Sequence, residues 1–243
     1  MAGHSKWSNI QHRKQAQDAK RGRLFTKLIR EITVAARNGA DPALHPRLRL
    51  AIDKALVANV SREAIDRAIK RGVGGLEGHD LEEIRYEGYG PGGVAIMVDA
   101  LTNNRNRTAA EVRHAFSKYG GNLGTDGAVA WQFHQKGLIS LQDDLDEEQL
   151  MALALATGAE DILNASEANP AYLITAVNHF NSVCLVLEQH EVTLHQAEIT
   201  WLPTTLTPLE DDSLRDTVHR LLEALEALED IQTVYAACVI GAF

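Results

Sequence analysis

Residues 137–164, "GLISLQDDLDEEQLMALALATGAEDILN", hold the pattern that decides the fold class. The first six residues predict a strand, the middle of the stretch predicts a helix with acidic residues at its start, and the end predicts a second strand. A further strand, helix and strand are predicted before residue 203. The order over residues 136–203 is therefore β-α-β-β-α-β, which is the ferredoxin-like signature.

The residues on both sides of this stretch predict a second group of strands and helices. On its N-terminal side, two strands flank the turn at Pro91-Gly92, and they are followed by a helix that starts at Thr108 and by a strand over 128–134. Thr108 and Glu111 have the spacing of a capping box. On its C-terminal side, an amphipathic helix and a last strand complete a β-β-α-β unit that is interrupted at residue 135.

The N-terminal part of the chain predicts helices alone. From Leu24 onward, apolar residues recur at spacings of three and four, as on the buried face of a helix. Two further helices are expected, and the last has Ser61 as its N-cap and ends at Gly72. The glycine-rich residues 72–80 then form a predicted hinge.

The predicted fold class is therefore α+β and multi-domain. It consists of an N-terminal basic helical bundle followed by two ferredoxin-like α/β domains, the second inserted in the first. The predicted domains are residues 1–78, residues 79–135 plus 207–243, and residues 136–206.

Composition limits the class of protein. The chain has 243 residues, 45% of them hydrophobic and 23% charged, which is ordinary for a globular protein. No apolar stretch reaches the roughly 18 residues that span a bilayer, so a membrane role is not expected. Cys184 and Cys238 lie far apart without a C-x-x-C motif, which favours buried thiols in a reducing compartment.

Motifs of catalysis and metal binding do not occur in a convincing form. "HEVTLH", residues 190–195, is close to the H-E-x-x-H zinc helix, but its histidines are five positions apart and fall on different helix faces. The acidic run from Asp143 to Glu148 is explained by the favourable position of acids at a helix N-terminus. We therefore predict no catalytic residue, no cofactor and no metal site.

Charge is distributed unevenly along the chain, whose formal net charge is -9. Residues 1–73 hold 16 Lys and Arg against 6 Asp and Glu, and the remaining residues hold 8 against 27. A targeting peptide, a solvated charged face and a surface for a polyanion would each place cations at the N-terminus. A secretory signal is disfavoured because no continuous apolar segment follows the first basic residues.

A nucleic-acid-binding surface is the interpretation that we favour for these cations. The first thirty residues contain eight basic residues and a single acid, Asp18, so few carboxylates are available to neutralise them. Phosphates would relieve the repulsion and release counterions. Arg105 and Arg107, in the segment "TNNRNRT" (102–108), suit either a phosphate site or a plain surface loop. The predicted nucleic-acid-binding residues are Lys6, Arg13, Lys14, Lys20, Arg21, Arg23, Lys27, Arg30, Arg105 and Arg107.

Four segments, in order, resemble hallmark segments of the YebC/PmpR family of bacterial regulators. They are "AGHSKWSNIQHRKQAQDAKRGRLFTKLIREI", "YEGYGPGGVAI", "NRNRTAAEVRHAF" and "GGNLGTDGAVAW". They lie in the first half of the chain, and the second half fits in layout more than in motif. The family usually has Asp where this chain has Asn103.

The resemblance implies a helical N-terminal domain followed by two α/β domains, no catalysis, and a cytoplasmic role in gene expression. Family members are described as DNA-binding transcriptional regulators, while the organellar relatives act as translational activators. DNA is therefore the expected partner, and ribosomal RNA bound by a translation factor is the alternative. The acidic domains are expected to orient the bundle or to recruit a protein partner.

Overall fold

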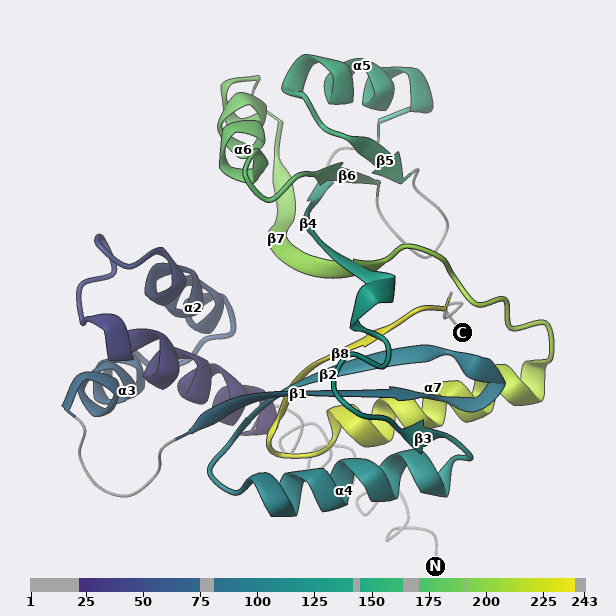
Figure 1. Ribbon diagram of the computed structural model, residues 1–243. Helices are drawn as coiled ribbons and strands as arrows, with labels where there is room; N and C mark the ends of the chain where they lie inside the picture. Colours follow the sequence, from purple (N-terminus) through teal and green to yellow (C-terminus); the bar gives the residue numbers. More distant parts are fainter. Residues whose placement is uncertain (1–21, 75–80, 142–144, 164–170, 191, 239–243) are drawn as a thin grey trace, which may run out of the picture. The chain divides into compact units, whose positions relative to one another are not determined.

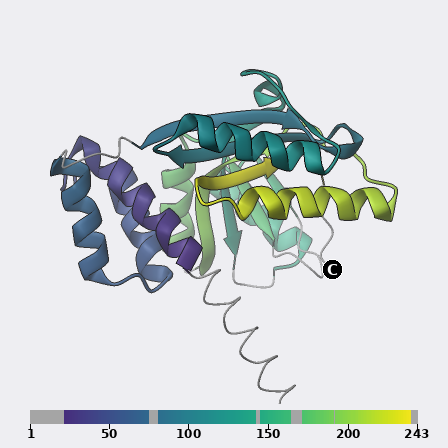
Figure 2. The ribbon, with the colours of Figure 1, turned by 90° about the horizontal axis from the view of Figure 1, so that it is seen from below.

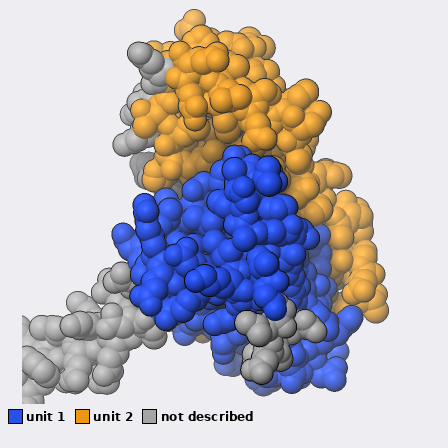
Figure 3. All heavy atoms as spheres, turned by 90° about the vertical axis from the view of Figure 1, so that its left-hand side faces the viewer, with its two compact units in different colours: residues 1–86, 98–118, 221–234 blue, residues 87–97, 119–220, 235–243 orange. Residues whose placement is uncertain are grey.

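The structure is a computed structural model that describes residues 22–74, 81–141, 145–163, 171–190 and 192–238. It is an α+β protein with two four-stranded sheets, so the predicted fold class is confirmed (Figure 1). The contacts within the chain divide it into two compact units (Figure 3). Unit 1 comprises residues 1–86, 98–118 and 221–234, and unit 2 comprises residues 87–97, 119–220 and 235–243. The domain boundaries expected from the sequence remain a prediction.

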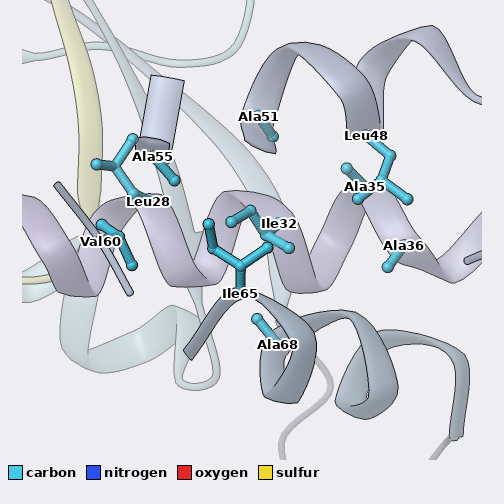
Figure 4. Close-up of a cluster of buried hydrophobic side chains, with 10 residues drawn as sticks. All are labelled: Leu28, Ile32, Ala35, Ala36, Leu48, Ala51, Ala55, Val60, Ile65 and Ala68. Atoms are coloured by element: carbon cyan, nitrogen blue, oxygen red, sulfur yellow. The ribbon is translucent and has the colours of Figure 1, made fainter. Parts of the chain in front are cut away.

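The N-terminal part is a three-helix bundle within unit 1. The helix over residues 22–35 continues into the short 3₁₀ turn η1 (Ala36–Asn38) and packs against α2 (Pro46–Val57) and α3 (Arg62–Gly74). Small and branched apolar side chains from these helices meet in one core (Figure 4). Its buried members are Leu28, Ile32, Ala35, Ala36, Leu48, Ala51, Ala55, Val60, Ile65 and Ala68.

The start of α3 is confirmed, but its expected end is wrong. Ser61 Oγ accepts a hydrogen bond from the Ala64 N–H, as an N-cap does. Gly72 lies inside the helix, which continues to Gly74. A Cβ atom at Gly72 would lie 2.3 Å from the carbonyl oxygen of Thr33. This glycine is therefore needed because α3 approaches the first helix closely, and it does not terminate α3.

The first sheet contains β1 (Glu82–Tyr89), β2 (Ala95–Thr102), β3 (Asn122–Leu123) and β8 (Ile231–Ala236), in the order β3-β1-β2-β8. The expected turn between β1 and β2 is present as η2 (Pro91–Gly93), where Gly92 has a φ of 70°. Helices α4 (Arg105–Lys118) and α7 (Asp212–Glu226) run along one face of this sheet (Figures 1 and 2). The chain leaves the sheet after β3 and returns to it only with β8.

The second sheet lies within unit 2 and confirms the β-α-β-β-α-β order predicted for residues 136–203. Its elements are β4 (Phe133–Leu141), α5 (Glu147–Thr157), β5 (Asp161–Leu163), β6 (Tyr172–Thr175), α6 (Phe180–Gln189) and β7 (Leu194–Pro203). The strands are antiparallel in the order β5-β6-β4-β7. Asp146 caps α5 with a capping box. Leu150 of α5, Leu187 of α6 and Leu173 of β6 are buried in one core.

Two expectations around α4 need correction. The helix starts at Arg105 and not at Thr108, because Asn104 Oδ1 accepts the Arg107 N–H and caps the earlier turn. Residues 128–134 are not one strand. They form the 3₁₀ turn η3 (Ala130–Gln132) before β4 begins, since the buried carboxylate of Glu87 accepts the N–H groups that a strand ladder would use.

None of the helices in the described ranges has the length and apolar character needed to cross a membrane.

Candidate nucleic-acid interface

The predicted nucleic-acid-binding residues fall into three groups. Lys6, Arg13, Lys14, Lys20 and Arg21 lie outside the described residues. Arg23 and Arg105 are exposed, and no ion pair involves either of them within the described ranges. Lys27, Arg30 and Arg107 make hydrogen bonds inside unit 1. Pairing within unit 1 therefore separates Lys27, Arg30 and Arg107, which contribute to the fold, from Arg23 and Arg105, which remain candidates for phosphate contact.

Asp230 organises the buried part of this region. Its carboxylate is only 1% exposed and accepts hydrogen bonds from Arg30 Nη1 at 2.8 Å and Arg107 Nη2 at 2.7 Å. The hydroxyls of Thr102 and Thr108 also lie within hydrogen-bond distance of it, at 3.0 and 2.7 Å. We call these five residues the Asp230 cluster. It joins the first helix, the end of β2, the start of α4 and the turn before β8.

Two basic residues of the first helix, Lys27 and Arg30, bond to the segment at the end of α7. Lys27 Nζ donates to the carbonyl oxygen of Glu226, the last residue of α7, where the helix dipole favours a cation. Arg30 is 17% exposed and also pairs with Glu229 at 2.7 Å. Burial lowers the pKa of the Lys27 amino group, while the charge of Glu226 opposes that shift. Lys27 and Arg30 thus hold the first helix against the end of α7.

The pKa values in the Asp230 cluster reflect strong pairing. Burial alone would raise the pKa of Asp230, but the hydrogen bonds from Arg107, Thr108, Thr102 and Arg30 together lower it. The hydrogen bond and the charge of Asp230 raise the pKa of Arg107. Asp230 is therefore an anion at neutral pH that already occupies the place where an external phosphate would meet these two arginines.

The exposed cations lie mainly on the bundle. Several of its basic side chains are exposed and have no ion pair among the described residues. They are Arg23, Arg37, Arg49, Arg62, Lys70 and Arg71. Three others pair with acids at the surface, for example Arg47 with Glu83 at 2.9 Å. The bundle therefore has a cationic surface even when the basic residues that pair with acids are left out of account.

A groove of about 620 Å³ lies beside Arg23 and Lys27 in unit 1. Its other wall comes from the end of α7 and from β8, and it includes Glu223 and Glu226. The Nε2 atom of Gln232 is buried there without a hydrogen-bond partner within the described part of the chain. Because acids and bases both line the groove, it lacks the single sign of charge expected of a phosphate channel.

Sequence reasoning missed a second buried carboxylate, Glu87, in unit 2. Glu87 is 6% exposed and accepts the backbone N–H groups of Gly127, Val129 and Ala130 at 2.9, 2.7 and 2.7 Å. These residues belong to the segment "GGNLGTDGAVAW", which carried the resemblance but no expected role. An isolated Glu in a strand gives no sequence signal for such a partner. The structure thus explains this segment as a loop clamped by a carboxylate.

The comparisons with known proteins assign the family. The chain matches the model of the TACO1/YebC protein N-terminal domain over residues 5–75 and that of the TACO1/YebC second and third domain over residues 81–238. The chain therefore belongs to the TACO1/YebC family, as the resemblance predicted.

Similar proteins cover nearly the whole chain. A protein of Idiomarina loihiensis named as a "Probable transcriptional regulatory protein" is 56% identical over 97% of this chain and 94% of its own length. A protein of Pseudomonas putida with the same description is 54% identical over 99% and 97%. The crystal structure of a conserved hypothetical protein from Aquifex aeolicus matches with a TM-score of 0.81 and 46% identity, covering 93% of each chain.

Proposed function

We propose that this protein is a non-enzymatic, DNA-binding transcriptional regulator that acts in the cytoplasm. The description shared by its bacterial relatives as probable transcriptional regulatory proteins supports regulation of gene expression. The observation that carries nucleic-acid binding is the surplus of cations in the N-terminal part of the chain, with 16 basic against 6 acidic residues in positions 1–73. Their exposed members are available to phosphates, whereas Lys27 and Arg30 are engaged in the fold.

The proposed mode of binding is contact with phosphates and not with base edges. Readout of bases needs Arg, Asn or Gln side chains held in a groove, usually on one helix of a symmetric dimer. Here the exposed arginines are spread over several faces of a small bundle, including Arg37, Arg49 and Arg62. Such a surface gives affinity that falls steeply with salt and depends little on sequence.

The salt dependence of binding to a duplex tests this proposal with the full chain. Each phosphate contact on duplex DNA contributes about 0.9 to the slope of log K against log salt. We expect Arg23→Ala and Arg105→Ala each to reduce the slope by about that amount. Arg113→Ala removes the same charge from an exposed position on α4 that was not predicted as a contact, so it is the matched control. A salt-independent wild type, or equal losses in all three variants, would overturn the proposed surface.

The alternative is a translation factor bound to ribosomal RNA, which the resemblance to organellar translational activators supports. The basic bundle suits either polyanion, so competition between unrelated duplexes and a structured ribosomal RNA fragment at fixed salt is decisive. A preference of about a thousandfold for one duplex would establish an operator-reading regulator. A strong preference for the RNA would put the translation role first. Recruitment of a protein through the acidic domains is compatible with both.

A further inference from the structure

Trp131 is placed unusually for a tryptophan. It lies in η3 and is 70% exposed, although tryptophan side chains are highly buried on average. Its neighbours Val129 and Phe133 are buried in one core cluster with Ala95 and Met97. The backbone is thus anchored two residues before and two residues after an indole ring that remains in solvent.

The loop that carries Trp131, residues 124–132, is fixed by hydrogen bonds and not by packing of the ring. The Glu87 carboxylate takes the N–H groups of Gly127, Val129 and Ala130, and the Glu87 carbonyl takes the Gly124 N–H at 2.8 Å. A short loop with so many bonds to one residue is preorganised. Presenting the ring in this way lowers the entropy lost when something binds to it.

The chemistry left available on Trp131 is that of its ring faces. The indole Nε1–H already donates to the Ala128 carbonyl at 3.2 Å, and the Tyr89 hydroxyl donates to the same oxygen at 3.1 Å. Gln132 Nε2 in turn donates to the Tyr89 hydroxyl at 3.3 Å. With its single polar atom satisfied within the loop, the ring offers stacking and no hydrogen-bond readout.

We propose that Trp131 is a stacking platform for an unpaired nucleobase, in a second contact site on unit 2. This inference rests on the proposed nucleic-acid binding and adds a single-stranded or unpaired region to the substrate. Within residues 124–132, Val129 is buried and Trp131 is the one large apolar side chain that is exposed, with the partly exposed ring of Tyr89 beside it. Asp126, exposed in the same loop, repels a close phosphate, so this site should add nothing to the salt slope. Stacking of this kind tolerates any base sequence.

Binding of full-length variants to a single-stranded oligonucleotide and to a duplex of equal length tests the platform. Trp131→Ala should weaken single-strand binding by about 5- to 150-fold, the range for the loss of one stacked base, with an unchanged salt slope. Trp131→Phe should retain most of the affinity, and duplex binding should not change. Leu155→Ala, which alters another exposed apolar residue of unit 2, is the matched control and should have no effect.

Fluorescence gives a second readout that an indirect structural effect would not produce. In a Trp7→Phe/Trp201→Phe protein, Trp131 is the only tryptophan of the chain. Its emission should be quenched on addition of the single strand and not on addition of the duplex, since only an unpaired base can stack on the ring.

The outcomes separate this inference from the proposed function. If the wild type binds the duplex with a steep salt slope but Trp131→Ala binds the single strand as the wild type does, the proposed function stands and the platform is wrong. If Trp131→Ala weakens duplex and single strand equally, the contact is not base stacking and the platform is again wrong. If the wild type binds no nucleic acid, both proposals fail.

Discussion

Two buried carboxylates, Asp230 in unit 1 and Glu87 in unit 2, each hold chain segments together by accepting hydrogen bonds, but from different kinds of donor. Both accept at least three hydrogen bonds, but Asp230 receives them from side chains of distant segments, whereas Glu87 receives them from the backbone of one loop. Two of the donors to Asp230 are arginines, and the donors to Glu87 are neutral amides. Loss of the Asp230 charge therefore removes the buried charge partner of Arg30 and Arg107, while loss of the Glu87 charge weakens hydrogen bonds from neutral amides.

The largest expected effect follows from Asp230→Asn. Arg30 would remain largely buried with only the exposed Glu229 as a charge partner, and breaking a buried ion pair from one side costs about 3 to 5 kcal/mol. We expect the lower end, about 3 kcal/mol, since Arg107 is 45% exposed and is partly solvated. Urea unfolding followed by circular dichroism measures this loss.

The neighbouring residue provides the control for that experiment. Glu229 also pairs with Arg30, at 2.7 Å, but it is exposed. Glu229→Gln should cost no more than about 1 kcal/mol, as surface pairs do. Equal losses for the two variants would mean that the buried pair of Asp230 with Arg30 stabilises the fold no more than a surface ion pair does.

A smaller effect is expected from Glu87→Gln. The buried N–H of Val129 and the half-buried N–H groups beside it would lose a charged acceptor, which costs about 1 to 3 kcal/mol. The loop should loosen before the rest of unit 2 unfolds. Hydrogen exchange at Gly127, Val129 and Ala130 should accelerate more than exchange in α5, and uniform acceleration would contradict a local clamp.

The two carboxylates also show which features of the structure can be predicted from the sequence and which cannot. Element types and order in residues 136–203 were predictable because they follow from apolar periodicity, and the start of α3 because Ser61 is a local capping residue. Gly72 was misassigned because a helix-ending glycine and a glycine required by a neighbouring helix have the same sequence signature.

The site was less predictable than the fold. The density of cations in the first thirty residues predicts a nucleic-acid-binding segment, and this stays a prediction. Spacing on a helix cannot tell a solvent-facing Arg23 from Arg30, which is held by Asp230 two hundred residues later. Likewise, the strand pattern of residues 128–134 did not reveal that Glu87 would take the N–H groups of Val129 and Ala130. In both cases the contact that the sequence did not reveal is a long-range one made by a buried acid.

Arg105 and Arg107, near the start of α4, allow an arginine that stabilises the fold to be compared with one that is exposed and unpaired in the described part of the chain. Arg107→Ala removes one of the donors to Asp230, and we expect a loss of about 1 kcal/mol because Arg30, Thr102 and Thr108 remain. Arg105→Ala should change stability by less than about 0.5 kcal/mol and should act on nucleic-acid binding alone. Thermal midpoints of the single variants measure the difference, and an Arg105 variant that melts as early as the Arg107 variant would make Arg105 structural too.

The smallest expected effect is the pH dependence contributed by Asp230. The folded-state pKa of this carboxyl is lowered by its hydrogen bonds, so the unfolded chain, in which Asp has a pKa near 3.9, binds its proton first as the pH falls. The stabilisation is therefore complete above the unfolded pKa and is lost as the pH decreases through the folded pKa. The difference in unfolding free energy between wild type and Asp230→Asn should be constant from pH 8 to 5 and smaller by about 0.3 kcal/mol at pH 4, with a continuing decrease below. Urea titrations of both proteins at constant ionic strength measure it. A difference that grows on acidification would mean that burial outweighs the hydrogen bonds at Asp230, so that the pKa of its carboxyl is raised in the folded state and not lowered.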